Sequence, residues 1–486
     1  MARTLFGRRQ IKTNEAAITA ENVVKVLSSA YTTHLANKDE IEYLYKYYKG
    51  KQAVLEREKE IRPEICNKII ENRANQIVNF RVGYTVGKPI QYVSTVSDDG
   101  TSDNIAKLND LMRVAGKASK DKQLVEWMMI CGVGYRIALS NEKRNAKVPF
   151  EIHTLDPRNT FVIRRNDIAG TVLAGVYYIT NENIDGTTTD KQTFYVYTND
   201  GDYFVIEGWQ SGKIIEHSKY LLNEIPIIEY PLNNARLGAF EVVLSLLDAL
   251  NDLDSNRLDS VAQNVQSLLV GYNCELPDGE TSNSLRDRGM VFLKSNGENK
   301  ADLKIISETL DQTQTETLKR DILDAINEIV GMPSQGNGST GDSSNNGAVI
   351  LKNGWQGAET RAQDFEMMFR EPEQKTLDIV VGICNGVIKD YDLDPDNIDI
   401  KFTRRNYEDL LTKSQTLITM LQNDKVHPQC AYEASGLFID TQDAYNMGMD
   451  WYEQQTKKAE EEAKQLLTAS ADNETAVNDV EENTAD

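Results

Sequence analysis

The sequence predicts a multi-domain α+β protein, and three observations support this fold class. At 486 residues, the chain is too long for one hydrophobic core, and its length favours roughly two to four domains. Residues 135–230 alternate between apolar and polar side chains, the period of antiparallel strands, whereas long stretches on both sides follow the helical period. The 40% apolar and 26% charged residues are ordinary for a folded soluble protein.

Charge is distributed unevenly along the chain, whose net charge is −22. Residues 466–486 carry acidic side chains and no basic one, and their low hydrophobicity predicts a disordered acidic tail. The first ten residues are basic but lack the apolar core of a secretory signal. No stretch approaches the roughly 18 apolar residues of a membrane span. We therefore expect an intracellular protein without a membrane segment.

Residue types that carry catalysis or hold metals are sparse. The five cysteines are scattered, which indicates reduced thiols, and only His427 and Cys430 place two soft ligands close together. A closed zinc site needs four clustered ligands, so no metal is predicted. Neither a Ser/His/Asp arrangement nor a pair of catalytic acids stands out. We predict no catalytic residue, no cofactor and no enzymatic activity.

The N-terminal part, residues 1–237, combines helices with a sheet. Helices are predicted over residues 21–50 and from about 63 to 78, because apolar residues recur there every three or four positions. The alternating region follows, with a strong hairpin turn at 198–202. This order predicts an antiparallel sheet packed against helices.

A long helix is predicted for residues 238–268, a rod over about 40 Å long. Its apolar residues form one narrow stripe, so its other faces, which carry Asp248, Asp252 and Asp259, are expected to face water. Such a helix suits packing beside copies of itself, and an ordinary bundle helix is the alternative.

Short strands are predicted for residues 269–306, and a second helix for residues 307–331. Gly331, with Pro333 two positions later, is typical of a helix end. The two long helices should therefore pair, with a small β subdomain inserted between them. This subdomain carries the basic residues Arg286, Arg288 and Lys294.

Two glycine-rich segments invite comparison with nucleotide-binding loops. Gly83–Pro89 has three residues between its glycines where a phosphate loop needs four, and proline replaces the magnesium-binding hydroxyl residue. The polar loop 332–347 contains a GxGxxG pattern at residues 336–341, but a helix precedes it and no βαβ unit surrounds it. For this loop, a surface linker and a segment presented to a partner both stay open.

The remaining chain is predicted to be largely helical. Residues 348–390 form a helix that Pro372 should kink. The acidic residues 392–396 mimic a calcium loop but lack its glycine and its final glutamate, which favours a solvated turn. Residues 391–465 add a short strand and further helices.

In their order and spacing, several stretches together resemble the portal proteins of tailed bacteriophages, the head-to-tail connector family. The resemblance covers about residues 43–453. It is carried by Tyr47–Gln52, Asn67–Phe80, Gly83–Pro89, Glu229–Asn234, Gly238–Glu241, Asp248–Asn251, Gly331–Pro333, Ser343–Ala348 and Lys401–Asn406.

The resemblance implies a ring, usually of twelve subunits, at one capsid vertex, through which DNA is packaged and ejected. It implies localisation in the virion after assembly in the host bacterial cytoplasm. Implied partners are non-specifically bound double-stranded DNA, the terminase, a head-tail adaptor, and the major capsid and scaffolding proteins. The implied regions are a wing (residues 1–237 and 348–390), stem helices (238–268 and 307–331), a clip (269–306), a tunnel loop (332–347) and a crown (391–465).

Three residue sets gain expected roles from this resemblance. The tunnel loop would touch DNA through Gln335, Asn337, Ser339, Thr340, Asp342, Ser343, Ser344, Asn345 and Asn346. Asp248, Asp252 and Asp259 would form an acidic channel wall that weakly repels the duplex, since many basic contacts would hold it. Arg286, Arg288 and Lys294 would meet the motor or adaptor. A nucleotide-dependent enzyme and another structural phage head or tail component are the alternatives.

Overall fold

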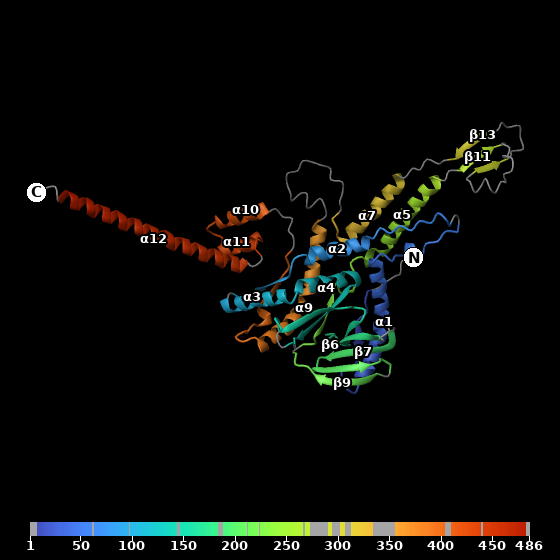
Figure 1. The fold of residues 1–486 in the computed structure, drawn as a ribbon, viewed down its shortest axis with the longest axis horizontal. Helices are drawn as coiled ribbons and strands as arrows, with labels where there is room; N and C mark the ends of the chain where they lie inside the picture. Colours follow the sequence, from blue (N-terminus) through green and yellow to red (C-terminus); the bar gives the residue numbers. More distant parts are fainter. Residues whose placement is uncertain are drawn as a thin grey trace.

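The computed structural model shows a mixed body of helices and sheets with two projections, a helix pair tipped by a small sheet and a unit of C-terminal helices (Figure 1). The α+β class predicted from the sequence is confirmed. The residues that the structure describes are 7–60, 63–96, 98–141, 143, 146–182, 188–210, 212–222, 224–265, 268–272, 290–293, 302–306, 313–333, 355–403, 410–438 and 441–482.

The outer part of the body is a six-stranded sheet with α1 (Val23–Tyr48) on one face. In spatial order its strands are β1 (Ile11–Thr13), β5 (Thr160–Arg165), β6 (Val172–Glu182), β7 (Thr188–Thr198), β8 (Asp202–Glu207) and β9 (Lys213–Lys219). Alternate strand residues such as Phe194 and Phe204 meet Tyr31 of α1 in an apolar core. The β7–β8 pair confirms the predicted hairpin.

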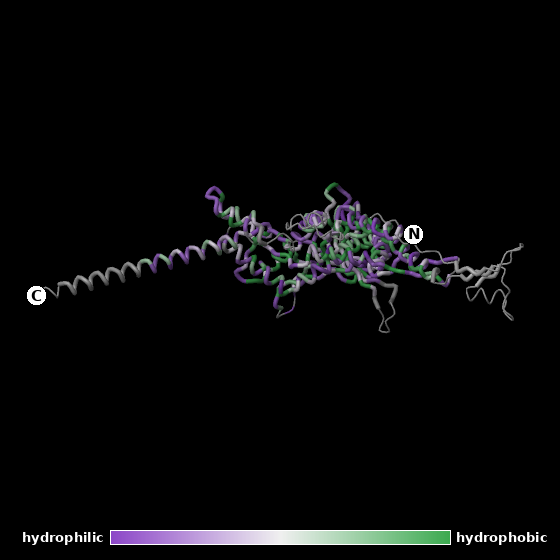
Figure 2. The backbone as a smooth tube through the Cα atoms, turned by 90° about the horizontal axis from the view of Figure 1, so that it is seen from above, coloured by the Kyte–Doolittle hydropathy of each residue, from purple (hydrophilic) through white to green (hydrophobic). Residues whose placement is uncertain are grey.

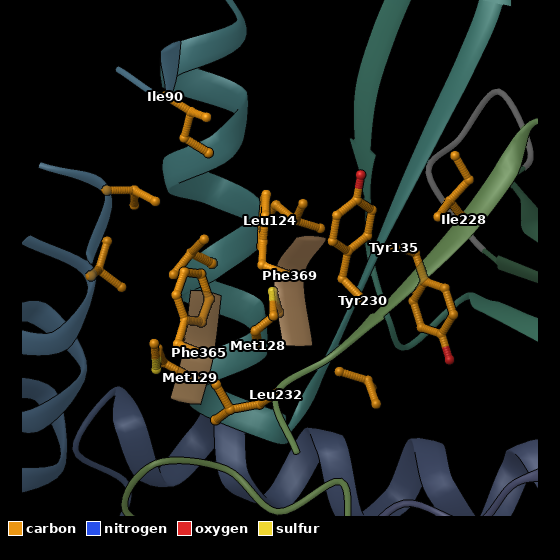
Figure 3. Packing of buried hydrophobic residues seen from close by; sticks show 14 of the residues in the cluster. Ile90, Leu124, Met128, Met129, Tyr135, Ile228, Tyr230, Leu232, Phe365 and Phe369 are labelled. Carbon is orange, nitrogen blue, oxygen red and sulfur yellow. The ribbon is translucent and has the colours of Figure 1, made fainter. Parts of the chain in front are cut away.

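A second, larger core lies between helices and a three-stranded antiparallel sheet. The sheet has the order β10 (Ile227–Pro231), β3 (Val133–Ser140), β4 (Phe150–Leu155). Around this core lie the helices α2 (Arg73–Val86), α3 (Asp99–Val114), α4 (Lys117–Cys131) and α9 (Trp355–Val387). The elements η1 (Ala53–Glu56) and η3 (Pro395–Asn397) are short 3-10 helices. The strands β2 (Gln91–Ser94) and β14 (Ile398–Lys401) pair with each other. Figure 3 shows Leu124 and Met128 of α4 packed with Tyr230 of β10 and Phe369 of α9.

The helix pair leaves the body from the turn η2 (Glu241–Val243). It consists of α5 (Leu244–Val265) and α7 (Thr313–Val330), which run side by side (Figure 1). At its far end lie β11 (Leu268–Tyr272), β12 (Met290–Leu293) and β13 (Asp302–Ile306), with β11 central, parallel to β12 and antiparallel to β13. The predicted insertion of strands between two paired helices is observed.

The C-terminal unit comprises α10 (Leu410–Leu421), α11 (Pro428–Ser435) and α12 (Thr441–Glu482). The last helix projects far from the body and is largely hydrophilic over residues 453–464 (Figure 2). Composition predicts disorder from residue 466 onward, whereas the structure continues the helix to Glu482. Low hydrophobicity argues against a packed core, but this stretch contains neither glycine nor proline to end a helix.

Two expectations about the first half of the chain are wrong. The helix expected from Pro63 begins only at Arg73, and residues 66–72 are not helical. The polar side of α5, expected to face water, is partly buried, since Asn251, Ser255 and Asp259 are all less than 9% exposed. The two errors share one cause, because the non-helical segment covers the polar side of α5.

Candidate channel and assembly surfaces

Two of the three predicted residue sets lie outside the residues that the structure describes. These are the loop residues from Gln335 to Asn346 and the basic set Arg286, Arg288 and Lys294. The third set, the three aspartates of α5, is described and differs from residue to residue.

Only Asp252 among these aspartates is exposed to solvent. Asp248 is half-buried and accepts a 2.8 Å hydrogen bond from the Tyr47 hydroxyl, and burial raises the pKa of its carboxyl. Asp259 is 2% exposed and is covered by Arg57, Lys59 and Asn67. Within the subunit, Asp259 therefore has no free carboxylate to present to a channel.

The polar side of α5 holds residues 63–72, which we call the strap, through a regular ladder. The backbone N–H groups of Glu71, Ile69 and Asn67 donate to Asn251 Oδ1 (2.8 Å), Ser255 Oγ (3.0 Å) and Asp259 Oδ1 (2.8 Å). Four helical residues rise about 6.0 Å and two extended residues about 6.6 Å, so the two repeats match step for step. Side chains of α5 thus accept the backbone hydrogen bonds of the strap, as the carbonyl groups of a neighbouring strand would.

Asp259 also forms the ionic end of this ladder. Its Oδ2 lies 2.9 Å from Arg57 Nη1 and 2.5 Å from Lys59 Nζ, and Asn67 Nδ2 donates to Oδ1 at 2.8 Å. Burial alone would raise the pKa of Asp259, but hydrogen bonds from Lys59, Asn67 and Arg57 outweigh it and hold the pKa well below its usual range. Asp259 stays ionised and fixes the strap.

A single lysine joins α7 to the same assembly. Lys319 Nζ lies 2.9 Å from Asp254 Oδ1 of α5 and 3.0 Å from Glu71 Oε2 of the strap. Burial lowers the pKa of this ammonium, but the two carboxylates outweigh that effect and raise the pKa. The helix pair and the strap therefore meet at one partly buried cation.

The root of α5 is fixed to the end of α4. Glu241 accepts hydrogen bonds from Arg8 Nη2 (2.6 Å) and from the backbone N–H of Gly238 (2.8 Å). At Gly238 a Cβ atom would lie 2.3 Å from the carbonyl oxygen of Ile130, so only glycine permits this approach. These contacts fix the start of α5, and with it the helix pair, to the body.

A buried ionic cluster lies at the centre of the body. Glu373 of α9, fully buried, accepts from Arg136 Nη1 of β3 (2.8 Å) and Lys117 Nζ of α4 (2.9 Å). Tyr92 and Tyr230 also donate to it, at 2.6 and 2.9 Å, and Asp121 contacts both cations. Burial would raise the pKa of Glu373, but attraction to the two cations lowers it to about 2.

The composition of this cluster indicates a structural role. Two cations face two carboxylates, so the charges balance, and none of the four side chains is more than 4% exposed. A substrate has no access to such groups, whereas α4, β3, β2, β10 and α9 are all tied together by them.

The outer surface of the helix pair, in contrast, exposes apolar side chains. Leu258 and Val261 of α5 are 41% and 37% exposed, and Leu318 and Ile329 of α7 are 50% and 43% exposed. Scattered apolar residues are ordinary on a protein surface, but four on one thin projection favour a partner surface.

Sequence reasoning missed the strap and the ionic cluster. The strap partners lie 180–192 residues apart, and the cluster draws single charges from separate elements, so no local pattern identifies which residues pair in either. One signal was present: Asn251, Ser255 and Asp259 recur at intervals of four on one side of a helix. A polar stripe this regular indicates a polar partner.

Within the described ranges, no three His, Cys, Asp or Glu side chains gather closely enough to hold a metal ion. In the same part of the chain, each helix is too short or too polar to cross a membrane. Gly83 lies inside α2 and Gly87 caps its end, so this segment is a helix terminus rather than a phosphate-binding loop.

Comparison with known proteins identifies the family. A model of the family described as phage portal protein, SPP1 Gp6-like, matches residues 28–472 of the 486. A search among curated proteins finds no match. Because the family model spans far more than half of the sequence, this chain belongs to the SPP1 Gp6-like family of phage portal proteins.

Proposed function

We propose that this chain forms a ring at one capsid vertex that serves as the channel for DNA packaging and ejection. The portal family is structural rather than enzymatic, and it implies an oligomeric ring in the virion capsid with phage head partners. The proposal rests on the helix pair α5 and α7, which is fixed to the body at one end and exposes the apolar residues Leu258, Val261, Leu318 and Ile329. A rigid pair that buries one side in its own subunit and exposes apolar residues elsewhere suits side-by-side packing in a ring.

The regions of the structure receive portal roles in this proposal. Residues 1–237 and α9 form the wing, α5 and α7 the stem, β11–β13 the clip, and residues 391–465, which include α10 and α11, the crown. The usual subunit number of the family, twelve, is the expected one. Terminase and a head-tail adaptor would dock at the clip, and capsid and scaffolding proteins would contact the wing.

The channel lining is proposed from charge. Of the three α5 aspartates, Asp252 is the exposed one, and it is our candidate for the acidic wall. The loop residues Gln335–Asn346, polar apart from three glycines and with Asp342 as their one charged residue, would contact passing DNA without sequence preference. A duplex that must move is better served by weak contacts than by many lysines and arginines, which would bind its phosphates tightly.

Imaging of the purified full-length chain tests the ring directly. Native mass measurement and negative-stain microscopy should give a closed ring with a central hole wide enough for a DNA duplex. A chain that stays monomeric at every concentration and salt would overturn the proposal. Nucleotide titration by calorimetry should show no binding, and tight nucleotide binding would favour an enzyme instead.

Two variants test the finer assignments. Deletion of residues 337–344 should leave ring assembly intact and impair DNA packaging, and normal DNA filling would remove the loop from the channel. Charge reversal at Arg286, Arg288 and Lys294 should weaken terminase or adaptor docking to the assembled ring. Unchanged docking would place that interface elsewhere.

A further inference from the structure

The C-terminal helices have almost no core of their own. Among residues 413–463 whose side chains the structure describes, only Ala431 and Ser435 are buried. Seven large apolar side chains of the same unit are exposed: Ile418 55%, Leu421 42%, Phe438 40%, Met447 66%, Met449 41%, Trp451 63% and Tyr452 64%. A unit with this balance gains little from burial within one subunit, because hydrophobic stabilisation scales with the apolar area removed from water.

The three helices form a layer with α11 in the middle (Figure 1). On one side, Lys413 of α10 donates to the carbonyl oxygen of Gly436 at 3.1 Å. On the other side, the rings of Tyr432 and Tyr445 lie 5.9 Å apart, and Gly448 of α12 sits against the Tyr432 hydroxyl. The outer helices α10 and α12 therefore have separate exposed faces.

Trp451, one of two exposed aromatic residues of α12, lies on a different side of this helix from Tyr445. At about 100° per residue, Met447 and Trp451 lie about 160° and 120° around α12 from Tyr445, which faces α11. They lie one turn apart and form one apolar surface with exposed fractions of 66% and 63%. On α10, Ile418 and Leu421 lie three residues apart and form a second exposed apolar surface.

We propose that Met447 and Trp451 of one subunit pack against Ile418 and Leu421 of a second copy of this chain, which completes the core of the C-terminal unit. The inference rests on the proposed ring. In a ring each subunit uses two different surfaces, one toward each neighbour, because the contact is heterologous. The unit has two such surfaces on its two outer helices, and each lacks apolar cover in the subunit.

A disulfide experiment tests this pairing in the full-length chain. Ile418→Cys and Trp451→Cys are combined in a Cys430→Ser background, since Cys430 is exposed and could form disulfides of its own. Oxidation of the assembled ring should give a ladder of covalent oligomers on denaturing gels. The matched control pairs Ile215→Cys, an exposed residue of the outer sheet, with Trp451→Cys and should give no ladder.

Trp451→Ala provides the independent measurement. Buried tryptophans commonly dominate interfaces, so this variant should need about tenfold or more protein to form rings, whereas Ile215→Ala should assemble as the wild type does. The fluorescence of Trp451 is obtained by subtracting the spectrum of the Trp451→Phe variant from that of the wild type. Acrylamide should quench this fluorescence in the free subunit but much less in the ring.

The outcomes separate this inference from the proposed function. A ring in which Trp451 stays accessible and no ladder forms would overturn the pairing while the ring stands. Protection of Trp451 only after another phage head protein is added would assign the surface to that protein and also overturn the pairing. A chain that never forms rings would overturn the proposed function itself.

Discussion

The body and the C-terminal helical unit differ in how many of their apolar side chains are buried within one subunit. In the body, helices and sheets from residues 41 to 400 enclose one continuous apolar core with a charge-balanced ionic cluster inside it. Among the described side chains of the C-terminal unit, two small residues are buried and seven large apolar ones are exposed. The difference indicates that burial within one subunit stabilises the body strongly and the C-terminal unit only weakly.

The strongest test of the body is the removal of a charge from its ionic cluster. Glu373→Gln keeps the side-chain shape but leaves Arg136 and Lys117 without full compensation in a buried site. We expect a loss of about 3–5 kcal/mol in the free energy of unfolding, measured by urea denaturation. Glu371→Gln, whose side chain is 80% exposed, is the control and should cost almost nothing. Equal small losses in both variants would show that the cluster contributes little.

The second test concerns the strap. Asp259→Asn removes the charge that pairs with Arg57 and Lys59 but leaves an oxygen to accept from the Asn67 N–H. The expected loss is about 2–3 kcal/mol, with faster hydrogen exchange of the Asn67, Ile69 and Glu71 amides. Asp252→Asn on the exposed side should change neither quantity. Slow exchange in both variants would mean that the strap does not depend on the ladder.

The body also predicts a pH dependence through His34. This ring is buried, stacks on Phe161, and its Nε2 lies 3.0 Å from the carbonyl oxygen of Arg158. Burial lowers the pKa of His34 from 6.5 to about 4; the carbonyl contact opposes this shift, and nearby Lys38 adds to it.

The lowered pKa fixes the sign of the effect. The unfolded chain takes up the proton first, so the contribution of His34 to stability is complete above pH 6.5 and falls as the pH drops toward 4. At pH 5 the loss should be about 2 kcal/mol relative to pH 8. Urea denaturation of wild type and His34→Gln at both pH values gives the difference, and His153→Gln, an exposed histidine, should retain the wild-type slope. A wild-type slope in His34→Gln would assign the pH dependence to other groups.

How far the sequence predicts this structure depends on the range of the interactions. The hairpin at 198–202, the paired helices and the strand insertion follow from turn residues and periodicity within short windows, and they are observed. The strap was predicted to be helical because Ile65, Ile69 and Ile70 have helical spacing. Its N–H groups instead find partners on α5 that lie 180 or more residues away, and no local pattern contains that information.

The sequence predicts the candidate channel and assembly surfaces less well than it predicts the helices and strands. The three α5 aspartates look equivalent in the sequence, yet only Asp252 is exposed. Tyr47 of α1 contacts Asp248, and Asn67 of the strap contacts Asp259, so distant segments decide which carboxylate is covered. The exposed apolar residues of α10 and α12 cannot be recognised in the sequence, since they are of the same types as the residues of a subunit core. Exposure in three dimensions is what separates the two.

The last prediction compares the same type of substitution, an aromatic residue to alanine, in the body and in the C-terminal unit, and it includes the smallest expected change in the free energy of unfolding. Phe369→Ala in the body removes a fully buried ring and should cost about 3–5 kcal/mol. Trp451→Ala in the C-terminal unit removes a larger ring that is 63% exposed, and in the unassembled subunit it should change the free energy of unfolding by no more than about 0.5 kcal/mol. Denaturation at protein concentrations below ring formation measures both. If Trp451→Ala cost as much as Phe369→Ala there, the C-terminal unit would have a core of its own, and the contrast between the two regions would disappear.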